Sequence, residues 1–74
     1  MESYISINPR VCNGKPVIAG TRIPVTVLID ELMAVQTIDG LLLRFPELTR
    51  QQVLGALQYC HSVIEHTEIE PVAA

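Results

Sequence analysis

The chain has 74 residues, enough for one domain, and a core of this size supplies only about 3–5 kcal/mol of net stability. Its two cysteines do not form a disulfide framework, and charged residues interrupt every apolar run before it could span a membrane, although 49% of the residues are hydrophobic. We therefore expect self-association, as a homodimer, to supply the missing burial. With no N-terminal export signal, the expected location is the reducing cytoplasm.

The net charge of −3 argues against a protein whose main task is to coat nucleic acid. The charge is unevenly distributed, because residues 1–29 hold three basic residues and one acid, whereas residues 30–74 hold two basic residues and seven acids. Any basic surface is therefore expected to lie mainly in the N-terminal part. Its basic residues are Arg10, Lys15 and Arg22.

The N-terminal third predicts short extended segments. Residues 4–7 alternate in polarity and stop at Asn8-Pro9, where the proline removes a hydrogen-bond donor. Two further pieces, Val11-Cys12 and residues 16–19, are expected on either side of Asn13-Gly14, a dipeptide that favours positive φ. The prediction is a small β-hairpin that must pack against helices, because such a hairpin is marginal alone.

Three helices are expected after the hairpin. Pro24 suits a first helical turn, and the helix that follows is apolar around most of its circumference as far as Val35. Thr37 is a good N-cap for a short second helix that Pro46 ends after Phe45. The third helix, residues 50–66, follows a cap at Thr49 and has apolar residues three and four apart. The predicted fold is mainly α, with one domain over residues 1–67 and a frayed tail over residues 68–74.

Three segments together resemble a known bacterial family. They are Asn13–Val25, which reads NGKPVIAGTRIPV, Phe45–Thr49, which reads FPELT, and Ala56–Tyr59, which reads ALQY. Over nearly the whole chain this pattern is similar to the family called domain of unknown function 433. The resemblance implies a homeodomain-like three-helix bundle, often dimeric, and kinship with the N-terminal part of VapB-type antitoxins. It implies no catalytic residues.

The residues themselves indicate no enzyme, cofactor or metal. Asp30 and Glu31 are neighbours on a helix and point about 100° apart, so they cannot flank one bond. Gly14-Lys15 lacks the other residues of a phosphate-binding loop. No serine or cysteine lies in a recognisable nucleophile context, and Cys60 belongs to the apolar stripe of the third helix. His61 and His66 are spaced too unevenly to bind zinc with Cys60.

Two helices joined by a proline-containing turn have the order of a helix-turn-helix, whose second helix presents its first residues to the major groove of DNA. Arginine reads guanine and glutamine reads adenine, although polar residues in a first turn are also ordinary surface. The basic N-terminal residues are candidates for phosphate contacts, and Arg22 is equally suited to anchoring the hairpin. The predicted DNA-binding residues are Arg10, Lys15, Arg22, Arg50, Gln51 and Gln52.

The first helix carries more apolar surface than one small core can cover, so we expect it to form the dimer interface through Val25, Leu28, Ile29, Leu32 and Met33. The resulting hypothesis is a non-enzymatic, DNA-binding, antitoxin-like regulator that acts as a homodimer, with DNA and a toxin or another protein as partners. The alternative is a dimeric protein–protein interaction module that does not bind DNA.

Overall fold

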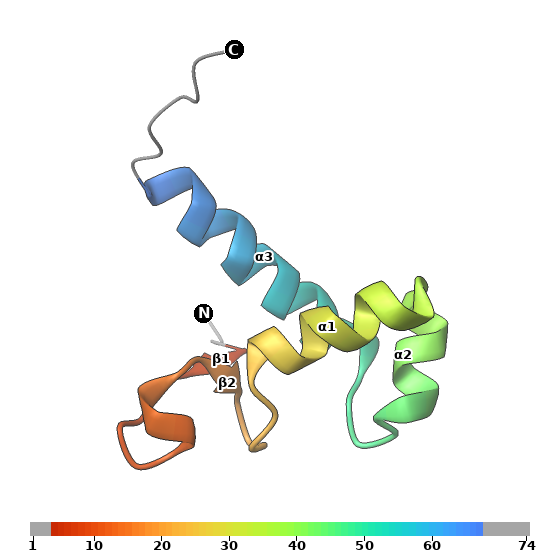
Figure 1. Cartoon of the computed structure of the whole chain (residues 1–74), viewed down its shortest axis with the longest axis horizontal. Coiled ribbons are helices and arrows are strands. Elements are labelled where there is room, and N and C mark those ends of the chain that lie inside the picture. The colour runs from red at the N-terminus through yellow and green to blue at the C-terminus, as the bar shows by residue number, and fades with distance from the viewer. Residues whose placement is uncertain (1–3, 68–74) are drawn as a thin grey trace.

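The computed structural model describes residues 4–67 as a short antiparallel hairpin followed by three helices (Figure 1), which confirms the mainly α prediction. The frayed tail expected over residues 68–74 lies outside the described residues. No helix in the described part is long and apolar enough to cross a membrane. The elements are β1 (Ile5–Ser6), the 3-10 turn η1 (Cys12–Gly14), β2 (Val17–Ile18), α1 (Val25–Val35), α2 (Ile38–Arg44) and α3 (Arg50–His66).

The hairpin pairs different segments from those expected. Ile5 lies opposite Ile18 in the register of β1 and β2, so Val11-Cys12 is not the partner of residues 16–19. The reason is local, because Cys12 and Asn13 adopt φ values of 51° and 57° and form η1 instead of a strand. The positive φ expected at Asn13-Gly14 is present, within the long loop of the hairpin.

The segment between β2 and α1 folds back on the hairpin. The Thr21 hydroxyl donates to the Ile18 carbonyl at 2.7 Å and accepts from the Ile23 amide at 3.1 Å. The Val25 amide then donates to the Pro16 carbonyl at 2.9 Å. Pro24 has φ −64° and ψ 144°, so it precedes the first helical residue and does not lie within the first turn as expected. These bonds attach the start of α1 to the sheet.

The helix ends follow their capping residues. Thr37 caps α2 as predicted, and α3 has the predicted bounds. Helix α2 ends at Arg44, one residue earlier than expected, because Phe45 precedes Pro46 and takes a non-helical conformation, φ −124° and ψ 75°. Gln36 separates α1 from α2 in the left-handed conformation, with φ 69°.

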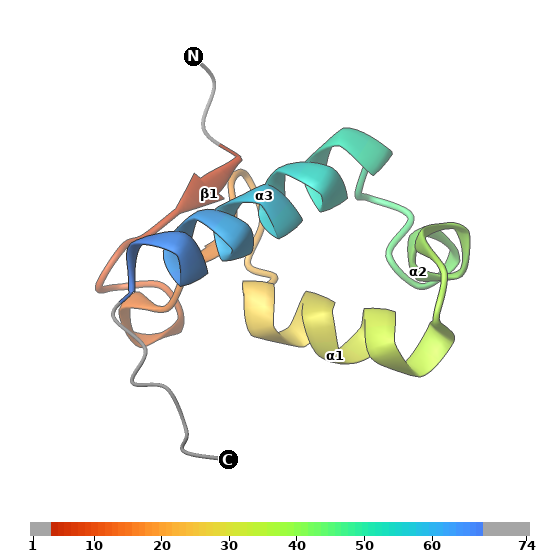
Figure 2. The same cartoon turned by 90° about the horizontal axis from the view of Figure 1, so that it is seen from above.

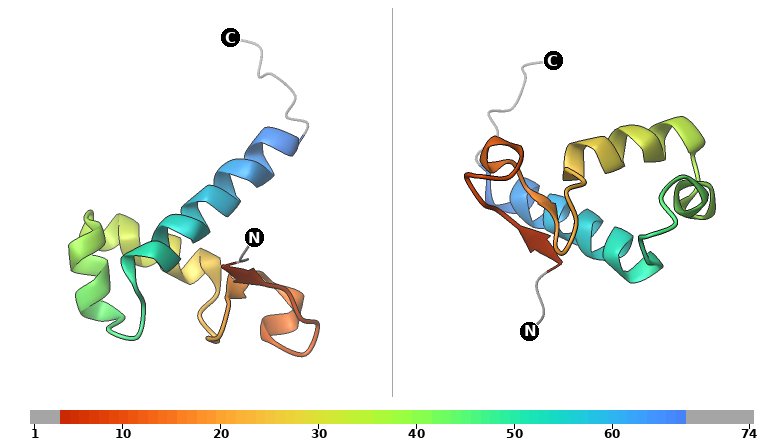
Figure 3. Two further views of the ribbon diagram at one scale, coloured as in Figure 1. Left: turned by 180° about the vertical axis from the view of Figure 1, so that it is seen from behind. Right: turned by 90° about the horizontal axis from the view of Figure 1, so that it is seen from below.

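One apolar cluster receives residues from the hairpin, all three helices and the α2–α3 turn. Ile18, Leu28, Leu41 and Val53 are its largest fully buried side chains, and Leu48 enters from the turn. The N-terminal half of α3 lies along this cluster, whereas every residue from His61 to Thr67 is exposed. Figures 1 and 3 show the distal end of α3 extending away from α1 and α2. The N-terminal half of α3 is therefore packed against the rest of the domain, and its C-terminal end is exposed to solvent.

Candidate nucleic-acid interface

The α2–α3 junction is a five-residue turn anchored in the core. The Leu48 amide donates to the Phe45 carbonyl at 2.9 Å, and the Leu48 side chain is buried. Arg44, at the end of α2, is paired with Glu31 of α1 at 2.9 Å between Nη1 and Oε2. The turn connects α2 to α3 in the order of a helix-turn-helix, and the ion pair connects α2 to α1.

The first turn of α3 is organised by a reciprocal cap. The Thr49 hydroxyl accepts from the Gln52 amide at 3.2 Å, and the Gln52 side-chain carbonyl accepts from the Thr49 amide at 2.8 Å. Two amides that a helix start leaves unpaired are thereby satisfied. The side-chain oxygen of Gln52 is an acceptor in this cap. Gln51, the other predicted glutamine, is exposed and takes no part in the cap.

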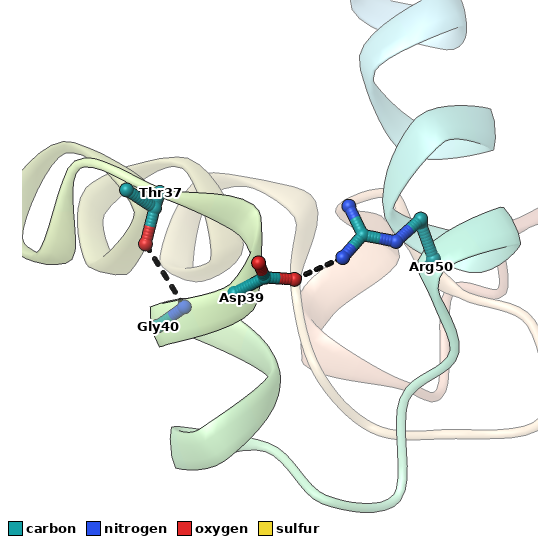
Figure 4. Close-up of polar contacts among 4 residues, drawn as sticks. All are labelled: Thr37, Asp39, Gly40 and Arg50. Atoms are coloured by element: carbon teal, nitrogen blue, oxygen red, sulfur yellow. Dashed lines mark hydrogen bonds and ion pairs between the residues drawn. The ribbon is translucent and has the colours of Figure 1, made fainter.

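Arg50 is held towards α2 by an acid. Its guanidinium Nη2 forms an ion pair with Asp39 Oδ1, next to the cap in which Thr37 accepts from the Gly40 amide at 3.0 Å (Figure 4). Both side chains are exposed, with 53% of Arg50 and 82% of Asp39 accessible. An added Cβ at Gly40 would lie 2.9 Å from the Thr37 hydroxyl oxygen, so a larger residue there would require the cap to shift.

The predicted N-terminal basic residues lie elsewhere. Arg10, Lys15 and Arg22 are all exposed, and the segments that carry them lie around η1 and the turn after β2. Figures 1 and 2 show η1 and α2 at opposite ends of the described chain, with the start of α3 beside α2. None of the three ion pairs among residues 4–67 involves Arg22. Within one copy, Arg10 and Lys15, which adjoin η1, are therefore separated from Arg50 at the start of α3.

The predicted dimer residues are mostly part of the chain's own core. Val25 is 5% exposed and Leu28 is fully buried, so the prediction that they form an intermolecular surface is wrong. Ile29 and Leu32 are half-buried against the same core, and only Met33, at 64%, is exposed. The apolar face of α1 is covered by the hairpin and the other helices, a coverage that helix periodicity alone does not reveal.

The exposed apolar surface lies at other positions, which the sequence interpretation did not select. On α3 these are Leu54, Val63 and Ile64, with 49%, 45% and 60% exposure. The spacing of residues 54, 57, 61 and 64 could have signalled a second face of this helix, separate from the core positions 53 and 56. The remaining large exposed hydrophobic residues are Ile7, Val27, Met33 and Leu43.

The histidine and cysteine residues do not form a metal site within residues 4–67. No group of three or more histidine, cysteine, aspartate or glutamate side chains between residues 4 and 67 is placed to hold a metal ion. Cys60 is half-buried against the core, and Cys12 lies in η1. The Nε2 atom of His61 instead lies 3.6 Å from Oε1 of Glu65, one helical turn further along α3.

Comparisons with known proteins point to one family. The family model described as "Protein of unknown function (DUF433)" matches residues 5–60. The crystal structure of a DUF433 member protein from Anabaena variabilis ATCC 29413 superposes with a TM-score of 0.76 at 33% sequence identity. The alignment covers 86% of this chain but 63% of that protein, so this chain spans less than two thirds of its relative. No curated protein matches.

Proposed function

The chain belongs to the DUF433 family, and we propose that it is a non-enzymatic, DNA-binding, antitoxin-like regulator that acts as a homodimer. One observation carries the DNA-binding part. The start of α3 is exposed, carries the Thr49–Gln52 capping box and follows α2 after a short hydrogen-bonded turn. A recognition helix that presents its first residues to the major groove has this arrangement.

Arg50 and Gln51 are the side chains that would read bases. A guanidinium has five N–H donors, so Arg50 can keep its bond to Asp39 and still donate to the edge of a guanine. Asp39 would then orient Arg50. Gln52 is better described as a capping residue than as a base-reading residue, because its carbonyl oxygen is already an acceptor within the protein.

Lys15, Arg10 and Arg22 would contact phosphates rather than bases. Arg10 and Lys15 adjoin η1, which lies at the opposite end of the described chain from α2 and the start of α3, so they would contact the backbone at a distance from the bases read by Arg50. With two or three such contacts in each copy, the affinity should fall with salt along a modest slope. The antitoxin part of the proposal is based on the resemblance to VapB-type antitoxins and predicts a toxin as the protein partner.

Binding to the promoter of its own gene, compared with a random duplex at about 150 mM salt, tests the proposal. We expect a preference for the promoter that Arg50→Ala reduces by about 1–3 kcal/mol, whereas Lys15→Ala weakens both duplexes alike. Equal affinity of the parent protein for the two duplexes would contradict it.

A dimeric interaction module without DNA binding is the second candidate. The observation that favours it is the apolar surface on the exposed part of α3, together with the net charge of −3. A chain that dimerises but binds neither duplex, even at low salt, would support this candidate over the first.

A further inference from the structure

Helix α3 carries a second apolar stripe beside the one that packs on the core. Leu54, Leu57, His61 and Ile64 follow one another at spacings of three, four and three residues, which places them within one stripe about 80° wide, as in the seam of a coiled coil. Leu54 and Ile64 are 49% and 60% exposed, and only Leu57 packs partly on the core. We call these four residues the α3 seam.

The spacing of the seam is symmetrical about Tyr59. Two α3 helices that run antiparallel and cross near this residue would place Leu54 of each copy opposite Ile64 of the other, and Leu57 opposite His61. Each exposed aliphatic side chain at one end of the seam thereby meets an exposed aliphatic side chain at the other end. The seams of two copies are therefore complementary to each other in this orientation.

The charges favour the same orientation. The N-terminal end of α3 carries the positive end of the helix dipole, and the C-terminal end carries Glu65, which is 64% exposed. An antiparallel pair brings these opposite ends together. A parallel pair would instead place Glu65 beside Glu65 and His61 beside His61.

We propose that a second copy of this chain occupies the α3 seam, in an antiparallel helix pair. The inference depends on the homodimer in the proposed function and moves its interface from α1 to α3.

The oligomeric state of matched variants tests the proposal. Ile64→Glu and Leu54→Glu place a charge in the seam, and each should weaken dimerisation at least about tenfold in sedimentation equilibrium. Val63→Glu is the control, because Val63 is an exposed aliphatic residue on the same helix but about 100° around from Ile64. It should dimerise like the parent protein. Matching circular dichroism spectra would show that all three variants fold.

Cysteine crosslinking tests the orientation. In a chain that carries Cys12→Ser and Cys60→Ala, Leu54→Cys alone should crosslink poorly, whereas Leu54→Cys with Ile64→Cys should give a covalent dimer under mild oxidation. These two positions are about 15 Å apart within one helix, so the bond can only join two copies. Efficient crosslinking through Leu54→Cys alone would indicate a parallel pair and overturn the proposal.

The outcomes separate this inference from the proposed function. If the parent protein is monomeric at high micromolar concentration, both the homodimer and the α3 seam fail. If it is dimeric but Ile64→Glu and Leu54→Glu behave like Val63→Glu, the seam fails and the homodimer remains. DNA binding by the parent protein is measured separately, on the promoter and random duplexes, and tests the DNA-binding part of the proposed function.

Discussion

Asp39, in the first turn of α2, forms an ion pair with Arg50, the first residue of α3, and so connects the two helices beside the turn that joins them. Exposed pairs of this kind contribute little to stability, about 0–1 kcal/mol. The importance of this pair is electrostatic, because a carboxylate lies beside the side chain that is proposed to read DNA. In the proposed complex with DNA, Asp39 would both orient Arg50 and repel phosphate.

Replacing Asp39 with asparagine separates these two effects. If repulsion dominates, Asp39→Asn should tighten binding to every duplex by about 0.5–1 kcal/mol, as measured by fluorescence anisotropy. Asp30→Asn is the charge-matched control on α1, where the exposed carboxylate has no ion pair with Arg50. An equal gain in DNA affinity in the Asp39→Asn and Asp30→Asn variants would show that the change in net charge alone is responsible.

The packing of Tyr4 on Gly55 gives a second prediction. An added Cβ at Gly55 would lie 2.6 Å from Tyr4 Cγ and 2.8 Å from Tyr4 Cβ, so the ring lies directly on the backbone of α3. Gly55→Ala should therefore destabilise the fold by about 1–3 kcal/mol in urea denaturation. In a Tyr4→Ala background the same change should be neutral or stabilising by up to about 1 kcal/mol, because alanine favours the helix. A penalty of equal size in both backgrounds would show that Tyr4 is not the obstacle.

The cap at Thr49 gives a third prediction. Thr49→Ala removes the hydroxyl that accepts from the Gln52 amide, and we expect a loss of about 1 kcal/mol of unfolding free energy. Thr49→Ser keeps the acceptor and should lose much less. Thermal unfolding followed by circular dichroism checks both variants, and equal stability of alanine and serine at this position would argue against the cap.

The burial of Leu28 gives a fourth prediction. Leu28→Ala should cost about 2–5 kcal/mol and unfold much of the population, because the side chain lies in the core of a single copy. Met33→Ser, on the same helix but at an exposed position, should change stability by less than about 0.5 kcal/mol. A variant that keeps the stability of the parent protein but loses dimerisation in sedimentation equilibrium would instead place Leu28 at an interface.

The local elements of this protein could be predicted from the sequence because their signals lie within a few residues of each other. Thr49 with Gln52 three residues later marks the start of α3, and Pro46 limits α2 because it disfavours the helical conformation at Phe45, the residue before it. The turn-forming preference of Asn13-Gly14 is equally local and is present in the structure. Hydrogen bonds and steric restrictions between near neighbours determine these features, so no knowledge of the rest of the chain is needed.

Partners distant in the sequence were decided by the tertiary structure alone. Periodicity shows that α1 is apolar, but not that Leu28 is covered by the same copy, nor that β2 pairs with β1. Likewise, Arg50 and Asp39 are eleven residues apart, and Tyr4 reaches Gly55 from the other end of the chain. Burial depends on how all elements pack at once, and the side chains left exposed on α3 are identified only when that packing is known.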